Sequence, residues 1–90
     1  MERRRIRIRG VVHDVGFASF VHGVATELGL GGYVVEDGEG VLIEAEGEPS
    51  RLDDFLRLLE AESPPLACVD SLEWKRIGTR RTTAFTMDAG

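Results

Sequence analysis

The segment Val11-Val12-His13-Asp14-Val15-Gly16-Phe17-Ala18 links two different sequence periodicities. Before it, residues 5–9 alternate arginine with isoleucine, which is the period of a half-buried strand. After it, apolar side chains recur at helical spacing from Phe17 to Leu28, and we expect a helix over residues 18–28. The segment therefore joins the end of a strand to the start of a helix.

A glycine-containing turn before a helix can bind an anion. The first N–H groups of a helix have no intrahelical partner, and they carry a partial positive charge. Connections of this kind are also common without any ligand. Taken alone, the segment therefore favours a plain connection over a phosphate or carboxylate site.

The middle of the chain is typical of a β-hairpin. Gly29 followed by Leu30 fits a helix end in which glycine takes the left-handed conformation. Residues 33–36 and 41–46 have strand character, and the turn Asp37-Gly38-Glu39-Gly40 between them supplies the positive φ that tight hairpins need.

A second helix is predicted after this hairpin. Ser50 is expected to cap it, with Asp53 and Asp54 in its first turn. Leucines and a phenylalanine at helical spacing form its buried side, and Pro64-Pro65 ends it.

Two further strands complete the predicted order. The alternation in residues 69–74 slips once between Val69 and Leu72, which a β-bulge would explain. A short last strand over residues 84–87 places Phe85 and Met87 on one face. The order predicts an α+β, ferredoxin-like fold, βαββαβ plus a short final strand, with two helices on one face of an antiparallel sheet. We expect one domain covering residues 1–90.

Charge is unevenly placed along the chain. The net charge of −5 argues against a general nucleic-acid binder, but nine of the eleven basic residues lie in residues 3–9 and 75–81. These clusters could attract an anionic partner. We favour a solvated outer sheet face on which Arg5, Arg7 and Arg9 pair with acidic neighbours such as Glu44 and Glu46. Exposed ion pairs of this kind contribute about 0–1 kcal/mol each to stability.

No metal or cofactor site is predicted. His22 lies off the apolar stripe, where it is expected to face solvent, and His13 is nine positions away on a loop. The acidic group Glu36, Asp37 and Glu39 lacks the ligand spacing of a calcium loop, so a solvated acidic turn is the favoured interpretation.

The compartment is expected to be the cytoplasm. Cys68 is the single cysteine and cannot form an internal disulfide. Nothing resembles a signal peptide, and no apolar run approaches the roughly 20 residues that span a bilayer. We therefore expect no membrane partner.

The order and spacing of several motifs resemble the acylphosphatase family over nearly the whole chain. They include Gly10-Val11-Val12, Val15-Gly16-Phe17 and Gly32-Tyr33-Val34. Within the family, the turns around residues 36–41 and 64–74 look most like the N-terminal acylphosphatase-like domain of the carbamoyltransferases that mature nickel-iron hydrogenases. The resemblance implies the same ferredoxin-like fold and a hydrolase acting on acyl or carbamoyl phosphates.

The resemblance also assigns site positions. In the family pattern, V-G-F is followed by an arginine that holds the phosphate, and Ala18 occupies that position here. The family motif G-W-V-x-N ends in an asparagine that orients the attacking water, and Glu36 occupies that position. Asp14 replaces a family glycine. The implied phosphate-binding residues are His13, Asp14, Val15, Gly16, Phe17 and Ala18.

We therefore expect an acylphosphatase-like domain with lost or greatly reduced activity. Arg9, Arg80 and Arg81 lie on segments that could bring a replacement cation to the loop. The expected partners are a small acyl or carbamoyl phosphate and other domains of a larger carbamoyltransferase. The alternative is a non-catalytic interaction module of such a carbamoyltransferase or a similar partner, which would dock through the acidic turn or the basic strand.

Overall fold

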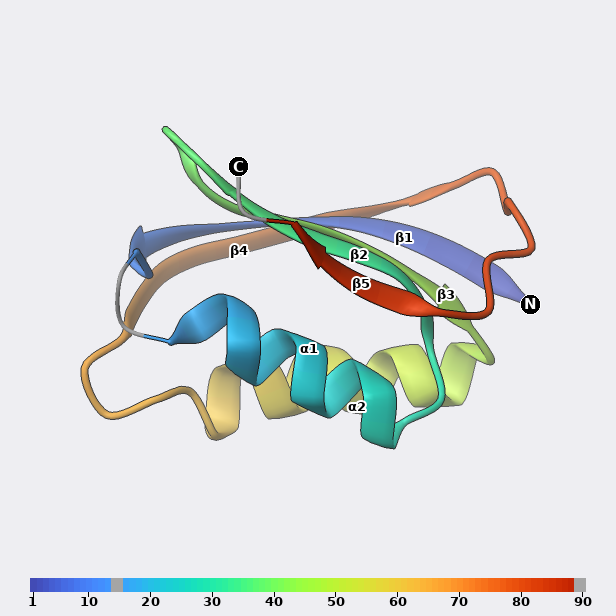
Figure 1. The fold of residues 1–90 in the computed structure, drawn as a ribbon, viewed down its shortest axis with the longest axis horizontal. Coiled ribbons are helices and arrows are strands. Elements are labelled where there is room, and N and C mark those ends of the chain that lie inside the picture. Colours follow the sequence, from blue (N-terminus) through green and yellow to red (C-terminus); the bar gives the residue numbers. More distant parts are fainter. Residues whose placement is uncertain (14–15, 89–90) are drawn as a thin grey trace.

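A computed structural model describes residues 1–13 and 16–88 and contains five strands and two helices in the predicted order. Figure 1 shows both helices on one face of the sheet. The ferredoxin-like prediction is thereby confirmed. In chain order the elements are β1 (Glu2–Val11), α1 (Phe17–Glu27), β2 (Gly31–Asp37), β3 (Gly40–Gly47), α2 (Pro49–Ala61), β4 (Cys68–Ile77) and β5 (Phe85–Asp88).

The sheet has the strand order β4-β1-β3-β2-β5 and is mixed rather than fully antiparallel. The first four strands pair antiparallel as expected, but β5 runs parallel to β2. The reason lies in the connection over residues 78–84. This connection stays at the end of the sheet where β4 finishes, and it crosses there from the β4 edge to the β2 edge (Figure 1). Because β2 also begins at this end, β5 runs parallel to it.

The core lies between the sheet and the helices. Alternate residues of β1, β2 and β3 face the helices, as the two-residue period predicted. Within the described chain, neither helix is long and apolar enough to cross a membrane. Fully buried side chains include Ile6, Ile8, Val21, Ala25, Val34, Val41, Ile43, Leu52, Phe55 and Leu59.

The structure corrects the predicted start of α2. Ser50 is not its cap. Glu48 is the N-cap residue, no side chain in the described ranges caps the helix, and Pro49 opens it. Proline fixes φ near the helical value and lacks the N–H that the first turn cannot satisfy. Because the helix begins at Pro49, Asp53 and Asp54 lie beyond its first turn.

The predicted bulge in β4 is confirmed. Arg9 pairs with Ser71 and Gly10 pairs with Val69, which leaves Asp70 as the extra residue on β4. The bulge accounts for the slip in the alternation between Val69 and Leu72.

The helix-free face of the sheet holds a buried ion network, not the solvated pairs that were expected. Arg3, Glu44 and Glu46 are each only 2% exposed. The Arg3 guanidinium lies 2.9 Å from Glu44 Oε1 and 3.1 Å from Glu46 Oε1. The loop before β5 closes over this network, because the backbone N–H groups of Arg80 and Arg81 donate to Glu46 at 2.8 and 2.9 Å.

Other arginines of β1 follow the expectation only in part. Arg5 pairs with Glu44 at 3.1 Å, whereas Arg7 pairs with Asp37 and not with Glu44 or Glu46. Arg9 forms no ion pair with any residue that the structure describes.

The network holds both carboxylates in their ionised form. Burial alone would raise the pKa of Glu44, but hydrogen bonds from Tyr33, Arg3 and Arg5 outweigh it and bring the pKa below its ordinary value. Burial likewise opposes ionisation of Glu46, and its pKa is nevertheless lowered by the Arg80 N–H, Arg3 and the Arg81 N–H. These two carboxylates therefore stay charged at neutral pH.

We predict that Glu44→Gln lowers the free energy of unfolding by about 3 kcal/mol, because it leaves the buried Arg3 charge without its closest counter-charge. Urea unfolding followed by circular dichroism measures this change. Glu60→Gln, which neutralises an exposed carboxylate on α2, should change stability by less than about 0.5 kcal/mol. Equal stability of the two variants would contradict the prediction.

Candidate functional site

The loop after β1, the start of α1 and the β2–β3 turn meet at one end of the molecule (Figure 1). The ring Nε2 of His13, in the loop, lies 2.6 Å from the carbonyl oxygen of Asp37, in the turn. The carbonyl can only accept, so Nε2–H donates this hydrogen bond. The predicted strand-turn-helix connection is present and is tied to the neighbouring hairpin.

Gly16 sets the start of α1. It is the N-cap residue, with φ 77° and ψ 16°, a left-handed conformation that glycine adopts without the steric cost of a Cβ. Its carbonyl accepts a hydrogen bond from Phe20 N at 3.0 Å, and the Phe17 side chain that follows is fully buried. The start of α1 is thus set by the backbone conformation of Gly16 and by the packing of Phe17 in the core.

The first turn of α1 has the features of an anion site. Among the described residues no side chain caps it through a hydrogen bond, and no acidic residue lies in it. The N–H groups of Phe17, Ala18 and Ser19 begin the helix and have no partner from the helix itself. These groups, with the positive end of the helix dipole, can bind a phosphate or carboxylate oxygen.

The two expected catalytic positions belong to separate elements. Ala18 lies in the first turn of α1, is half-buried and packs against the core. Glu36 is half-buried near the end of β2, on the same sheet face as the buried Val34, which is the face that the helices cover. Position 18 therefore offers a backbone N–H but no cation, and position 36 offers a carboxylate.

The acidic turn is held by an arginine. Arg7 Nη1 lies 2.7 Å from Asp37 Oδ1, and Arg7 Nη2 lies 3.7 Å from Glu39 Oε2. The Arg7 hydrogen bond, with a second one from the Glu39 N–H, lowers the pKa of Asp37 below its ordinary value. Among the described residues, no group of three metal-ligating side chains occurs here or elsewhere.

The structure places the remaining predicted site residues as follows. His13, Gly16, Phe17 and Ala18 lie at this end of the molecule, and Asp14 and Val15 fall outside the described residues. The link from His13 to the Asp37 carbonyl was not predicted. It depends on how closely the loop approaches the hairpin, which no local sequence pattern signals.

Each candidate replacement arginine lies away from the start of α1. Arg80 and Arg81 bind Glu46 through their N–H groups, at the far end of β3 from the β2–β3 turn. Arg9 alternates with Ile8 on β1, so it lies on the face away from α1.

The expectation for His22 is also corrected. It is half-buried, and its ring centroid lies 6.1 Å from that of Phe85 on β5. The reason is that β5, which pairs with β2, lies next to α1.

The sequence profile of the acylphosphatase family matches residues 4–87. The chain belongs to the acylphosphatase family. A curated acylphosphatase from Caldivirga maquilingensis is 44% identical over 73 residues, covering 79% of this chain and 76% of that protein. The crystal structure of acylphosphatase from Bacillus subtilis superimposes with a TM-score of 0.93 at 28% identity, covering 98% of this chain and 99% of that one.

The family also includes much larger relatives. Carbamoyltransferase HypF2 from Cupriavidus necator is 50% identical over 74 residues, which cover 82% of this chain but 9% of that protein. The acylphosphatase-family chain thus spans about a tenth of the length of the carbamoyltransferases that it matches.

We predict opposite effects of alanine at the two glycines of this region. Gly16→Ala should lower stability by about 1 kcal/mol, because the added Cβ opposes the left-handed backbone although it meets no neighbour. Gly23→Ala, inside α1 and equally uncrowded, should raise stability by about 0.5–1 kcal/mol through helix propensity. Thermal unfolding of both variants tests the conformation of Gly16. A stabilising Gly16→Ala would contradict it.

Proposed function

We propose that this acylphosphatase-family domain binds the phosphate group of an acyl or carbamoyl phosphate at the start of α1 and hydrolyses it near the uncatalysed rate. The observation that carries the proposal is the composition of positions 18 and 36. An alanine and a glutamate stand where the family resemblance places an arginine and an asparagine. Support comes from Gly16 and the first turn of α1, whose N–H groups have no partner within the helix.

The physical reason for low activity is electrostatic. Hydrolysis of a carboxyl-phosphate bond without a covalent intermediate depends on positioning water and on neutralising charge that develops on the phosphoryl oxygens. Backbone N–H groups supply part of this stabilisation. Ala18 adds no positive charge, and the Glu36 carboxylate adds a negative charge in place of a neutral amide. Both changes disfavour the transition state more than they disturb the fold.

The relatives favour carbamoyl phosphate as the ligand class. The chain is 50% identical to a region of a carbamoyltransferase, and it is similar to stand-alone acylphosphatases as well. We propose that residues 1–90 form one domain that works in the cytoplasm beside other domains of a larger carbamoyltransferase. A purely non-catalytic interaction module is the second candidate, favoured by the acidic turn, where Glu36 and Asp37 are half-buried and Glu39 is exposed.

We predict that Ala18→Arg combined with Glu36→Asn raises acetyl phosphate hydrolysis by about 100-fold, the order of effect that one transition-state hydrogen-bond donor supplies. Release of inorganic phosphate at saturating acetyl phosphate measures the rate. Thr26→Arg with Glu27→Asn makes the same change of net charge at exposed positions at the other end of α1, and it should leave the rate unchanged.

Two results would contradict this proposal. One is equal hydrolysis by the site variant and the control variant. The other is brisk hydrolysis by the unaltered chain that Gly16→Ala abolishes, because the present residues would then suffice for catalysis.

A further inference from the structure

The strand β4 forms a free edge of the sheet. It is ten residues long, and four consecutive residues of its second half, Glu73, Trp74, Lys75 and Arg76, are all exposed. The helices pack mainly against other elements, α1 against β2, β5 and α2, and α2 against α1 and β3. A long free edge has a row of N–H and C=O groups available to another strand.

We propose that β4 pairs antiparallel with β4 of a second copy of this chain, about a two-fold axis at Trp74, so that the two sheets continue into one. This inference concerns a surface that contains none of the candidate phosphate-site residues. It goes beyond the proposed function and does not depend on it.

The charges around Trp74 are self-complementary under that symmetry. In the two-fold pairing, Trp74 faces Trp74 of the second copy, and each Glu73 faces a Lys75. Glu73 and Lys75 form no ion pair with any residue in the described part of this chain. The pairing would give each of these exposed charges an opposite partner.

The same charges select the register. Moving one strand by two residues in one direction places Glu73 opposite Glu73, and moving it in the other places Lys75 opposite Lys75. Like charges directly opposite each other destabilise a strand pair. The register centred on Trp74 is therefore favoured over the two registers shifted by two residues. Those two are the nearest registers that also keep the helices of both copies on the same side of the sheet.

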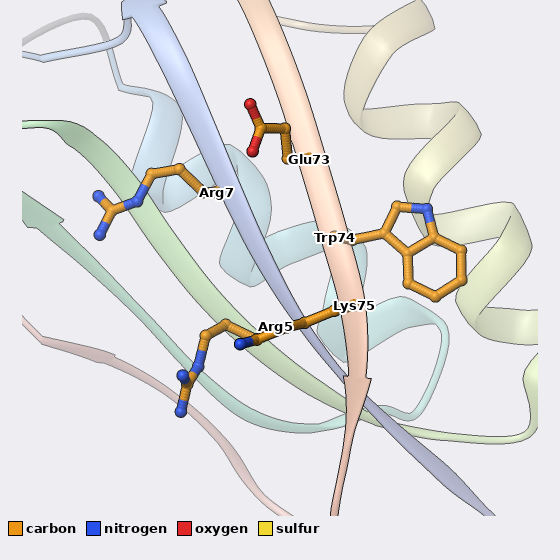
Figure 2. Close-up of a pocket in the computed structure, with 5 residues that line it drawn as sticks. All are labelled: Arg5, Arg7, Glu73, Trp74 and Lys75. Atoms are coloured by element: carbon orange, nitrogen blue, oxygen red, sulfur yellow. The ribbon is translucent and has the colours of Figure 1, made fainter.

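The outer groove of the sheet shows why Lys75 lacks a counter-charge among the residues that the structure describes. Arg5, Arg7, Glu73, Trp74 and Lys75 line this open groove of about 320 Å³. In Figure 2, Glu73 and Lys75 lie on the side of β4 toward Arg5 and Arg7, while the Trp74 ring points away from them. Lys75 is directly opposite Arg5 in the sheet, a like charge, so an acid from a second copy would stabilise it.

Trp74 has one covered side and one open side. The Arg4 guanidinium lies 4.1 Å from the centroid of its ring, and the residue remains 46% exposed. In the proposed pairing the open side meets the same ring of the second copy on the helix-covered face. Aromatic pairs across strands add to the stability of the pairing.

The test is sedimentation velocity of the full chain from about 10 µM to 1 mM, a range suited to a small interface. The unaltered chain is expected to dimerise with rising concentration. Glu73→Lys and Lys75→Glu should each weaken the dimer about tenfold or more, because each places two pairs of like charges opposite each other. An equimolar mixture of these two variants should form heterodimers, since every facing pair is then opposite in sign.

Glu27→Lys makes an equal charge change at an exposed position on α1 and should dimerise like the unaltered chain. A chain that stays monomeric at 1 mM would overturn the proposal. So would dimers that persist in both single variants, because the contact would then lie elsewhere, and so would a mixture that fails to associate.

Discussion

The buried contacts of Arg3 with Glu44 and Glu46 set the arrangement of the sheet's helix-free face. They join β1 to β3 across the centre of the sheet, and Glu46 also accepts hydrogen bonds from the loop that leads to β5. That loop places β5 beside β2, where Phe85 packs near Phe55 and His22. An ion pair on one face thereby helps fix where α1 lies on the other.

The position of α1 matters because the candidate site is built largely from backbone. Gly16 starts the helix in a left-handed conformation, and the buried Phe17 anchors it to the core. The N–H groups of the first turn depend on the fold and not on which side chain follows Phe17. A family scaffold can therefore keep its anion-binding geometry while substitutions at positions 18 and 36 alter its chemistry, which is the basis of the proposed loss of activity.

Alternation and helical spacing predict the order of elements well, because each reports directly which side of an element is buried. Even the slip near Asp70 signals the bulge in β4. The parallel direction of β5 is not predictable in this way, since it follows from the path of residues 78–84 around the end of the sheet. The burial of Glu44 and Glu46 also depends on strand register and loop cover, which no local pattern contains.

The candidate site is predictable to a similar extent. The segment that forms the turn before α1 is evident from the sequence, whereas the contacts of Asp37 with His13 and Arg7 depend on tertiary approach. The exclusion of Arg80 and Arg81 as replacement cations follows from their place at the opposite end of β3. Their charge and their place on segments that could approach the loop made those arginines candidates, and the topology removes them.

A titration of the unaltered chain with inorganic phosphate, followed by the backbone amide resonances in NMR spectra, tests the central proposal most directly. We predict weak, saturable shifts concentrated at the amides of Phe17, Ala18 and Ser19, with no comparable shifts on adding sodium chloride to the same ionic strength. Amides of the first turn of α1 that do not respond to phosphate, or that respond equally to chloride, would contradict the proposal that this family scaffold keeps its anion site.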